Sequence, residues 1–438
     1  MSEQPGSQDR HGGLAGWSFR ARLWSVAGVA LALRLVLQRF EPPPPRGVVA
    51  DEQWYVALAH NVLHGKGFVS VFYPLVDTQT ALHGPLTVFL LMPATLLQPH
   101  GYGLQRATIG VVGALTVVVV GLVARELGGE RLGIIAAMLA AVYPGFWVND
   151  MVATSESPAI LLLAVILLVS IRYRRAPSTP KLLALGALLG MLALDRAELA
   201  VLGLALVVPA VVRPVRDGTR SWREAAASIG LALLVAVGVV APWSAYNQAR
   251  FHQTVLISNN LGQTLVGANC KESYFGPLTG YDGRKCFLAV RPLANPNANE
   301  AQQDAHYRNA AVDYALHHWH RWPVVGAMRE LWLWSLWKPG WTVFMAGVYI
   351  GRPAWAAWTQ ISSFWLLTPL AIYGFVVARR RRTLIAPLIT MVAFTALLGL
   401  LVVGHLRYRV PAELAFVLTG AIALDELCFE RRSRGAPS

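Results

Sequence analysis

Long apolar segments recur along this chain, and they limit the folds that are open to it. A helix that crosses a lipid bilayer needs about 20 largely apolar residues, and it satisfies its own backbone hydrogen bonds where no water is present. Of the 438 residues, 55% are hydrophobic and only 14% are charged. This composition excludes an ordinary soluble domain. We therefore predict an all-α polytopic membrane protein.

About ten spans are expected. Eight segments reach or approach the length of a span: 23–40, 107–123, 132–147, 158–171, 229–243, 361–378, 384–403 and 412–424. Two shorter apolar runs, 182–194 and 199–212, flank Asp195-Arg196-Ala197-Glu198 and complete the set. The segment 85–97 is apolar but short, and it contains Pro93, so we expect an interfacial or re-entrant helix there instead of a span.

The net charge of +14 follows the predicted spans. Basic residues gather in the short hydrophilic gaps, and a single alternating path through the membrane places every group on the same side. The groups are Arg10, Arg20 and Arg22; Arg125 and Arg131; Arg172, Arg174, Arg175 and Lys181; Arg213, Arg216, Arg220 and Arg223; Arg379, Arg380, Arg381 and Arg382; and Arg431, Arg432 and Arg434. The positive-inside rule makes this side cytoplasmic and puts both termini there. Because topology accounts for the charge, no nucleic-acid partner is expected.

This topology divides the chain into a cytoplasmic tail (1–21), a transmembrane domain (22–428) and a second cytoplasmic tail (429–438). Two long segments of the domain, 41–105 and 244–355, face away from the cytoplasm. The first sixteen residues are polar, and no small-residue cleavage site follows the first span. We therefore expect that span to be a retained anchor in the inner or plasma membrane.

The second outward segment carries two further signals. Nine of the fifteen tryptophans lie between Trp319 and Trp365. Because tryptophan prefers the headgroup zone, we expect this stretch to lie along the outer membrane surface, with the core of a soluble lobe as the alternative. Cys270 and Cys286 also lie in this segment, where a disulfide can persist. Two free thiols are the alternative.

Two acidic points stand at outer ends of predicted spans. Asp51 and Glu52 open a helical pattern in the first outward segment, and Glu156 stands in Ser155-Glu156-Ser157-Pro158. A carboxylate there can take a proton from an acceptor hydroxyl as that oxygen attacks a sugar carbon. Two such points can also share a divalent cation, Mg²⁺ or Mn²⁺, or divide acid and base roles. Capping of a helix N-terminus is the alternative role for each.

Arginines accompany these acids on the outward side. Arg407 and Arg409, in Arg407-Tyr408-Arg409, break the positive-inside trend. An arginine fork binds phosphate oxygens and stabilises a phosphate leaving group, although a snorkelling anchor is the alternative. Asp195, Arg196 and Glu198 interrupt an apolar stretch, where ionisable groups usually pair or line a cavity, and they could hold a lipid phosphate or an acceptor. A bare turn between two short spans is the alternative for these three residues.

Taken together, these residues resemble the lipid-linked-sugar glycosyltransferases of the GT-C fold, in particular the bacterial relatives of protein O-mannosyltransferases and of the aminoarabinose transferase that modifies lipid A. The resemblance runs from Asp51 to Pro411. Its motifs are Asp51-Glu52 with Tyr55, Gly65-Lys66-Gly67-Phe68, His83-Gly84-Pro85-Leu86, Ser155-Glu156-Ser157-Pro158, Leu194-Asp195-Arg196-Ala197-Glu198, Ala241-Pro242-Trp243 with Asn247, and Arg407-Tyr408-Arg409-Val410-Pro411. Each motif is weak alone, and their order and spacing are fairly specific.

The resemblance implies a GT-C-type bundle whose extracytoplasmic loops bear interfacial helices. It also implies an inverting transfer of a hexose or pentose from a polyprenyl-phosphate donor, among membrane lipids, to a hydroxyl of a glycan, lipid or protein. Asp51 inherits the role of catalytic base, with Glu52 beside it, and Glu156 corresponds to the second-loop acid of the family. The donor-phosphate ligands would be Arg407, Arg409, Tyr408, Arg196 and His83, and the cavity would be lined by Tyr55, Glu198 and Asn247.

This chain departs from the family pattern at two positions. His83 stands where some members carry a lysine for the donor phosphate, and Tyr246 stands where the family often has an arginine. Members also differ in their need for a metal, which leaves a divalent cation at Asp51 and Glu156 open. A lipid transporter or flippase is the alternative function, but its polar residues would be expected through the middle of the membrane.

Overall fold

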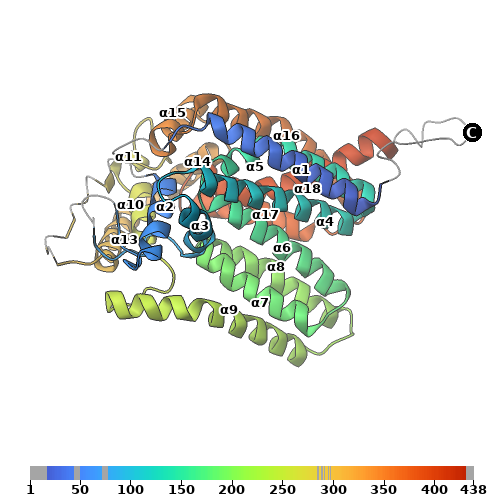
Figure 1. Cartoon of the computed structure of the whole chain (residues 1–438), viewed down its shortest axis with the longest axis horizontal. Coiled ribbons are helices and arrows are strands. Elements are labelled where there is room, and N and C mark those ends of the chain that lie inside the picture. The colour runs from blue at the N-terminus through green and yellow to red at the C-terminus, as the bar shows by residue number, and fades with distance from the viewer. Residues whose placement is uncertain are drawn as a thin grey trace, which may run out of the picture.

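The computed structural model of the chain is built almost entirely from helices (Figure 1). It describes residues 17–43, 50–71, 77–283, 286, 287, 290, 292, 293, 295 and 297–430. The long helices run along the long axis of the molecule. Four other helices gather at its left end in Figure 1, opposite the C-terminus: α2 (Asp51–Leu63), α10 (Leu261–Ala268), α11 (Lys271–Tyr274) and α13 (Glu300–His317). This arrangement separates a helical bundle from a cap of loops and short helices.

Six of the described helices are long and apolar enough to cross a membrane. They are α1 (Phe19–Leu37), α4 (Gly103–Val142), α6 (Glu156–Arg175), α8 (Ala197–Arg216), α9 (Trp222–Phe251) and α16 (Ala354–Arg380). Three shorter helices belong to the same bundle, namely α7 (Thr179–Asp195), α17 (Ala386–Leu401) and α18 (Val410–Asp425). The chain is therefore a multi-pass membrane protein, as predicted.

Helix α4 is a hairpin of two arms. Its backbone leaves the helical conformation at Gly128 and Gly129, and Gly129 has a φ of 89°. A Cβ placed on Gly121 would lie 3.1 Å from the carbonyl oxygen of Gly133, whereas residues twelve apart in one straight helix are separated by about 18 Å. The two arms match the predicted spans 107–123 and 132–147. With both arms and the three shorter helices counted, ten segments result, but only six helices meet the length requirement, so that number stays a prediction.

The bundle packs around α18. Nearly all side chains of α18 are buried, and they face α4, α6, α16 and α17. Gly374 of α16 lies directly on the carbonyl of Thr419, where a Cβ has no room, and this allows the two backbones to approach closely. Helix α9 differs, because few of its residues are buried and its contacts within the bundle are with α7 and α8. Its remaining surface is apolar and suited to lipid.

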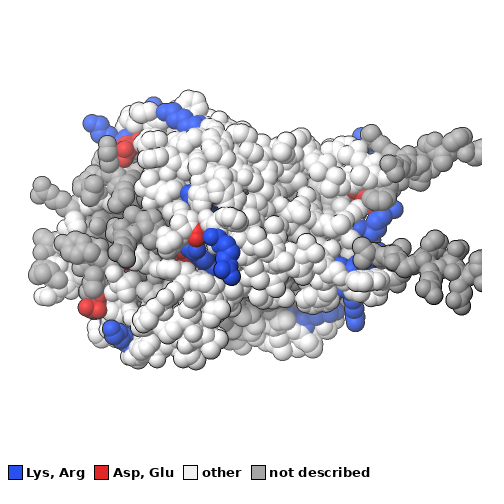
Figure 2. Space-filling model, turned by 45° about the horizontal axis from the view of Figure 1, so that its top comes forward, with Lys and Arg blue, Asp and Glu red and all other residues white. Residues whose placement is uncertain are grey.

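Charged residues lie mainly toward the two ends of the bundle. Figure 2 shows a face that is largely uncharged between its ends, apart from one small group of charged side chains near the middle. At the end near the C-terminus, Glu126 pairs with Arg172 and Arg175, and Asp425 pairs with Arg131 and Arg381. These contacts place three of the predicted basic groups together. Arg10, Arg431, Arg432 and Arg434 lie outside the described residues.

The opposite end is formed by the two outward segments. The first contains α2 (Asp51–Leu63) and α3 (Leu86–Leu97), which is the short helix expected around Pro93. The second contains α10 (Leu261–Ala268), α11 (Lys271–Tyr274), α13 (Glu300–His317), α14 (Trp322–Leu333) and α15 (Pro339–Ile350). These helices form the cap.

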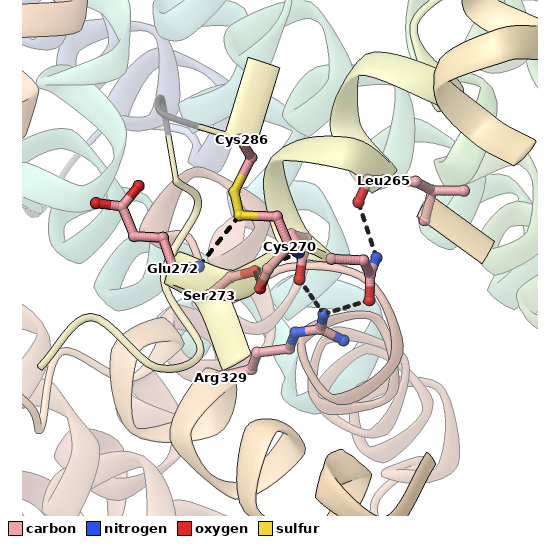
Figure 3. The surroundings of a disulfide bond; sticks show 8 residues. Leu265, Cys270, Glu272, Ser273, Cys286 and Arg329 are labelled. Carbon is pink, nitrogen blue, oxygen red and sulfur yellow. Dashed lines mark hydrogen bonds between the residues drawn. A yellow bond between two sulfur atoms is a disulfide. The ribbon is translucent and has the colours of Figure 1, made fainter. Parts of the chain in front are cut away.

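A disulfide closes one loop of the cap (Figure 3). It joins Cys270 to Cys286, whose Cα atoms are 5.6 Å apart. Beside it, Arg329 of α14 donates from Nη2 to the carbonyl of Ala268 and to Oδ1 of Asn269, at 2.7 and 3.1 Å. The bond and the arginine together fix the loop after α10 against α14.

Candidate active site

Arg407 is the point at which the two predicted acidic motifs meet. Its Nη2 lies 2.6 Å from Oδ2 of Asp51 and 2.7 Å from Oε1 of Glu156. Its Nε also donates to Oε1 of Glu156, at 2.8 Å. The fold thus collects three residues from three distant parts of the sequence into one cluster of charges.

The ends of the helices explain why these side chains converge. Asp51 and Glu156 are the first residues of α2 and α6, and Arg196 precedes the first residue of α8. Arg407 lies in the 3₁₀ turn Leu406–Arg409, which leads directly into α18. Four helix N-termini therefore point toward one place. The partial positive charge at each end favours the two carboxylates and any anion bound there.

A second arginine extends the cluster. Arg196 contacts Oε1 of Glu156 through Nη1 at 2.9 Å and Oε1 of Glu198 through Nη2 at 2.8 Å. Its guanidinium carbon lies 5.4 Å from the centre of the Tyr408 ring. Side-chain exposure then separates the two acids, because Glu156 is 6% exposed and Asp51 is 29% exposed. Asp51 is the carboxylate that an incoming substrate can reach.

His83 stands beside Asp51. Its Nε2 lies 3.7 Å from Oδ1 of Asp51, and its ring stacks on Tyr55, with ring centres 5.4 Å apart. Trp54 contacts the same ring at a centre distance of 4.9 Å. The neighbouring Gly84 lies directly on the carbonyl of Leu194, where no Cβ fits. The His83-Gly84-Pro85-Leu86 motif therefore packs against the Leu194–Glu198 turn.

A large cavity opens beside this cluster. It has a volume of about 730 Å³ and is lined by Tyr55, His83, Arg196, Glu198 and Arg407. Loop residues 253–261 and parts of α13 and α17 complete its wall. This size lies in the usual range for a small-molecule site, about 300–1,000 Å³. A smaller chamber of about 30 Å³ also reaches Asp51, Glu156 and Arg407, and it is lined further by Asn149, Thr342, Arg352 and His405.

Burial and the neighbouring charges together set the protonation states of Asp51 and His405. Burial opposes the ionisation of Asp51, but the guanidinium of Arg407 and the imidazole of His83 outweigh it and hold the pKa of Asp51 well below its usual range. Burial, together with the charge of Arg407, lowers the pKa of His405 to about 3. Asp51 is therefore ionised and His405 neutral at physiological pH.

Glu52 does not share this site. Its carboxylate is 2% exposed and accepts two hydrogen bonds from Arg106, from Nε at 2.8 Å and from Nη2 at 2.7 Å. It also accepts one from the backbone N–H of Ala153, at 2.9 Å. Successive residues of a helix are turned by about 100°, so Asp51 and Glu52 face different ways. Glu52 ties α2 to α4 and to the loop before Glu156, and this geometry gives no support to its predicted catalytic role.

Arg409 and Asn247 also lie away from the cavity. Arg409 is fully buried, pairs with Glu413 at 2.7 Å and lies 3.8 Å from the centre of the Phe364 ring, so it is not placed to bind a phosphate. Two residues along a 3₁₀ turn are rotated by about 240°, which separates Arg409 from Arg407. Asn247 is buried, donates to the carbonyl of Val255 and accepts from Arg250, and it does not line the cavity.

Asp195, which the sequence groups with Arg196 and Glu198, lines the large cavity and accepts a hydrogen bond of 2.6 Å from the hydroxyl of Thr87. Several other residues of the site were not predicted. Arg352 lines the small chamber and donates to Gln360. Arg352 breaks the positive-inside trend as Arg407 does, and that signal was available in the sequence. His405 and loop 253–261 lack any pattern of charge or periodicity that marks them.

The guanidinium of Arg407 occupies the place between Asp51 and Glu156 where a bridging cation would lie. The Nη2 of Arg407 stands between Oδ2 of Asp51 and Oε1 of Glu156, within 2.7 Å of both. In the part of the chain that the structure describes, no group of three or more His, Cys, Asp or Glu residues is arranged to hold a metal ion. Asp51 and Glu156 as placed here therefore do not fit a shared divalent cation.

Known proteins resemble this chain in part of its sequence and in its fold. Residues 83–246 match the family model described as dolichyl-phosphate-mannose-protein mannosyltransferase. This segment includes His83, Glu156 and Arg196, whereas Asp51 and Arg407 lie outside it. The predicted resemblance to mannosyltransferase-like proteins is confirmed over this part of the chain. No curated protein matches the sequence.

Solved structures define the fold more closely. The oligosaccharyltransferase of Archaeoglobus fulgidus, in complex with Zn and sulfate, has a TM-score of 0.54 and 17% identity over 94% of this chain and 50% of its own. The same organism's AglB, in complex with an inhibitory peptide and a dolichol-phosphate, has a TM-score of 0.53 and 15% identity over 96% of this chain and 52% of its own. This chain thus spans about half the length of those proteins. The predicted GT-C fold is confirmed.

A third solved structure is more distant in shape. ArnT from Cupriavidus metallidurans, bound to undecaprenyl phosphate, aligns over 97% of this chain and 82% of its own, with 14% identity and a TM-score of 0.45.

Proposed function

We propose that this protein is an inverting glycosyltransferase that moves a sugar from a polyprenyl-phosphate donor to an acceptor hydroxyl on the extracytoplasmic face of the membrane. One observation carries the proposal. A partly exposed carboxylate, Asp51, pairs with Arg407, whose guanidinium lines a 730 Å³ cavity at one end of a membrane-spanning bundle. The match to a mannosyltransferase family model and the GT-C fold support the same chemistry.

The donor phosphate is expected to bind at Arg407 and Arg196. Both guanidiniums line the cavity, and the four helix N-termini add partial positive charge at the same place. The prenyl chain is then free to lie among the apolar helices, since the bundle is embedded in lipid. As the bond between the sugar carbon and the phosphate oxygen breaks, these guanidiniums stabilise the charge that builds on the phosphate.

The acceptor hydroxyl is expected to be activated at Asp51. In this structure Asp51 is held by Nη2 of Arg407, and a donor phosphate that binds the same guanidinium shares it with Asp51. The buried Glu156 keeps Arg407 and Arg196 in place for both. The hydroxyl oxygen attacks the sugar carbon from the face opposite the phosphate, and the anomeric centre inverts. This sequence of steps uses side chains of the chain itself and routes no step through a divalent cation.

The transporter alternative lacks support among the described residues. The ionised groups of the cavity lie at the outer ends of helices, whereas a transporter needs polar groups near the middle of the membrane. The location with both termini in the cytoplasm belongs to the proposal and follows from the positive-inside rule.

The test is a transfer assay with the purified protein in lipid nanodiscs. Undecaprenyl phosphates that carry radiolabelled mannose, glucose, galactose or aminoarabinose serve as donors, and membranes from a strain without the gene supply the acceptor. Transfer with release of undecaprenyl phosphate is expected for the wild type and a loss of at least about 100-fold for Asp51→Asn. The matched control is Glu130→Gln, a half-exposed carboxylate paired with Arg125 on the predicted cytoplasmic side. Full transfer by Asp51→Asn would contradict the assignment.

A further inference from the structure

We propose that His83 takes the proton from the acceptor hydroxyl and that Asp51 acts through His83, so that the two residues form a catalytic dyad. The inference rests on the proposed transferase function and concerns how that reaction moves its proton. It gives His83 a role in acid–base chemistry in place of the expected phosphate binding, and it makes Asp51 the partner of the base instead of the group that itself takes the proton.

The first argument is that each carboxylate oxygen of Asp51 faces a neighbouring side chain. One of its oxygens, Oδ2, is held by Arg407 at 2.6 Å, and the other, Oδ1, faces His83. These neighbours keep the pKa of Asp51 far below neutrality. A general base works best when its pKa is near the working pH, and a carboxylate that stays ionised is a weak one. Such a carboxylate is better suited to orient an imidazole and to stabilise the imidazolium that forms.

The second argument is the placement of the His83 ring. Tyr55 stacks on it at an interplanar angle of 26°, Trp54 contacts it nearly at right angles, and the ring lines the 730 Å³ cavity. The histidine side chain is 15% exposed, which leaves it reachable from the cavity while its orientation is fixed. Its 3.7 Å separation from Asp51 is longer than a hydrogen bond. Catalytic contacts are often this long without substrate and shorten when it binds.

In this arrangement the proton of the acceptor hydroxyl passes to His83 and then to water. Asp51 accepts the Nε2–H of the neutral ring, which leaves the lone pair of Nδ1 for the acceptor. The hydroxyl proton passes to Nδ1 while the hydroxyl oxygen bonds to the sugar carbon. The bond from that carbon to the phosphate oxygen breaks, and its electron pair stays on the phosphate at Arg407. The imidazolium formed beside Asp51 then releases its proton to water.

Charged groups of both signs surround His83. Asp51 of α2 and Glu300 of α13 interact electrostatically with the ring. Arg196, Arg407 and Asp195 line the same cavity as the ring. Histidine is the side chain whose ordinary pKa lies nearest neutrality, so this mixed surrounding suits a group that accepts and releases a proton.

The test compares His83→Lys with His83→Gln, because lysine would preserve a phosphate ligand but not a base near neutral pH. For a catalytic base, both variants lower kcat by about 100-fold or more, with a small change in the KM for the donor. The rise of kcat with pH between pH 5 and 8, expected for the wild type, is lost in the residual activity of both. Wild-type kcat in His83→Lys, together with a raised KM in His83→Gln, would identify a phosphate ligand and overturn the dyad.

A second set of measurements distinguishes a loss of catalysis from misfolding of these variants. Thermal unfolding and binding of undecaprenyl phosphate without a sugar are recorded for each variant, and His83→Ala is assayed with added imidazole. Partial rescue of kcat by imidazole is expected, and its absence in a folded His83→Ala that still binds undecaprenyl phosphate would count against the dyad. If the wild type transferred no sugar from any polyprenyl phosphate, the proposed function would fall as well. Transfer that persists undiminished in His83→Lys would overturn the dyad alone.

Discussion

The acidic side chains of this site differ in how deeply they are buried. Glu156 accepts from two arginines and is almost fully buried, so its removal would leave Arg196 and Arg407 without the carboxylate that they share. Asp51 shares one of those arginines but is 29% exposed, so it stays accessible while paired. A buried carboxylate such as Glu156 therefore holds the arginines in position, whereas a partly exposed carboxylate such as Asp51 remains accessible.

Glu52 tests this division, because it is adjacent to Asp51 but holds Arg106 in a buried pair. Removing one partner of a buried ion pair costs about 3–5 kcal/mol. We expect Glu52→Gln to lower the unfolding temperature of the detergent-solubilised protein clearly, whereas Asp51→Asn, at a partly exposed site, lowers it much less. Thermal unfolding followed by tryptophan fluorescence compares the two variants directly. An equal loss of stability in both would show that Glu52 does not hold α2 in the way described.

At the level of helices, the sequence predicts most of the fold. The apolar run 361–378 lies within α16, and the run 412–424 lies within α18, because the energetic cost of a polar residue in lipid marks the ends of a span. Asp51, Glu156 and Arg407 were predicted for the same reason, since ionisable groups at the end of an apolar helix stand out. The directions in which the side chains of Glu52 and Arg409 point depend on the rotation of their helices and on their packing partners. Sequence motifs alone do not specify either.

The loop that carries His83 depends on one close contact between elements. Gly84 lies directly on the carbonyl of Leu194, so a methyl group has no room there unless the loop moves away from the turn between α7 and α8. We expect Gly84→Ala to cost about 1–3 kcal/mol of stability and to reduce transfer by displacing His83 from Asp51. Gly28→Ala in α1, where a Cβ meets nothing within 4 Å, is the matched control. Wild-type transfer and stability in Gly84→Ala would refute the packing described.

The disulfide loop of the cap has its own dependence on pH. Burial raises the pKa of Asp282 to about 6, although the charge of Arg407 opposes the rise. The folded protein thus binds this proton more tightly than the unfolded chain does. The contribution to stability is full below about pH 4 and is lost as the pH rises through 6.

Thermal unfolding between pH 4 and 7.5 tests this dependence by comparing the wild type with Asp282→Asn, which cannot ionise. The stability of the variant relative to the wild type is expected to increase with pH over this range, with most of the change between pH 4 and 6. A difference in unfolding temperature that stays constant with pH would show that Asp282 has an ordinary pKa.

Considered as one body, the protein is polarised along its bundle. The cavity and its charges lie with the cap, whereas the basic groups of α6 and α16 lie near the C-terminal end. An enzyme with this polarity reaches donor and acceptor from one side of the membrane only. Because the charged cavity lies at the cap, the orientation of the chain determines on which side of the membrane the proposed transfer takes place.

Cysteine labelling in intact cells tests that orientation. In a Cys428→Ser background, His100→Cys places a thiol on the exposed loop between α3 and α4, and Ala176→Cys places one on the exposed loop between α6 and α7. The loop at Ala176 is flanked by Arg172, Arg174, Arg175 and Lys181, so the positive-inside rule predicts that it lies in the cytoplasm. A membrane-impermeant maleimide is therefore expected to label His100→Cys in intact cells and Ala176→Cys only after permeabilisation. The reverse pattern would place the cavity in the cytoplasm, and labelling of both thiols in intact cells would refute the alternating path through the membrane.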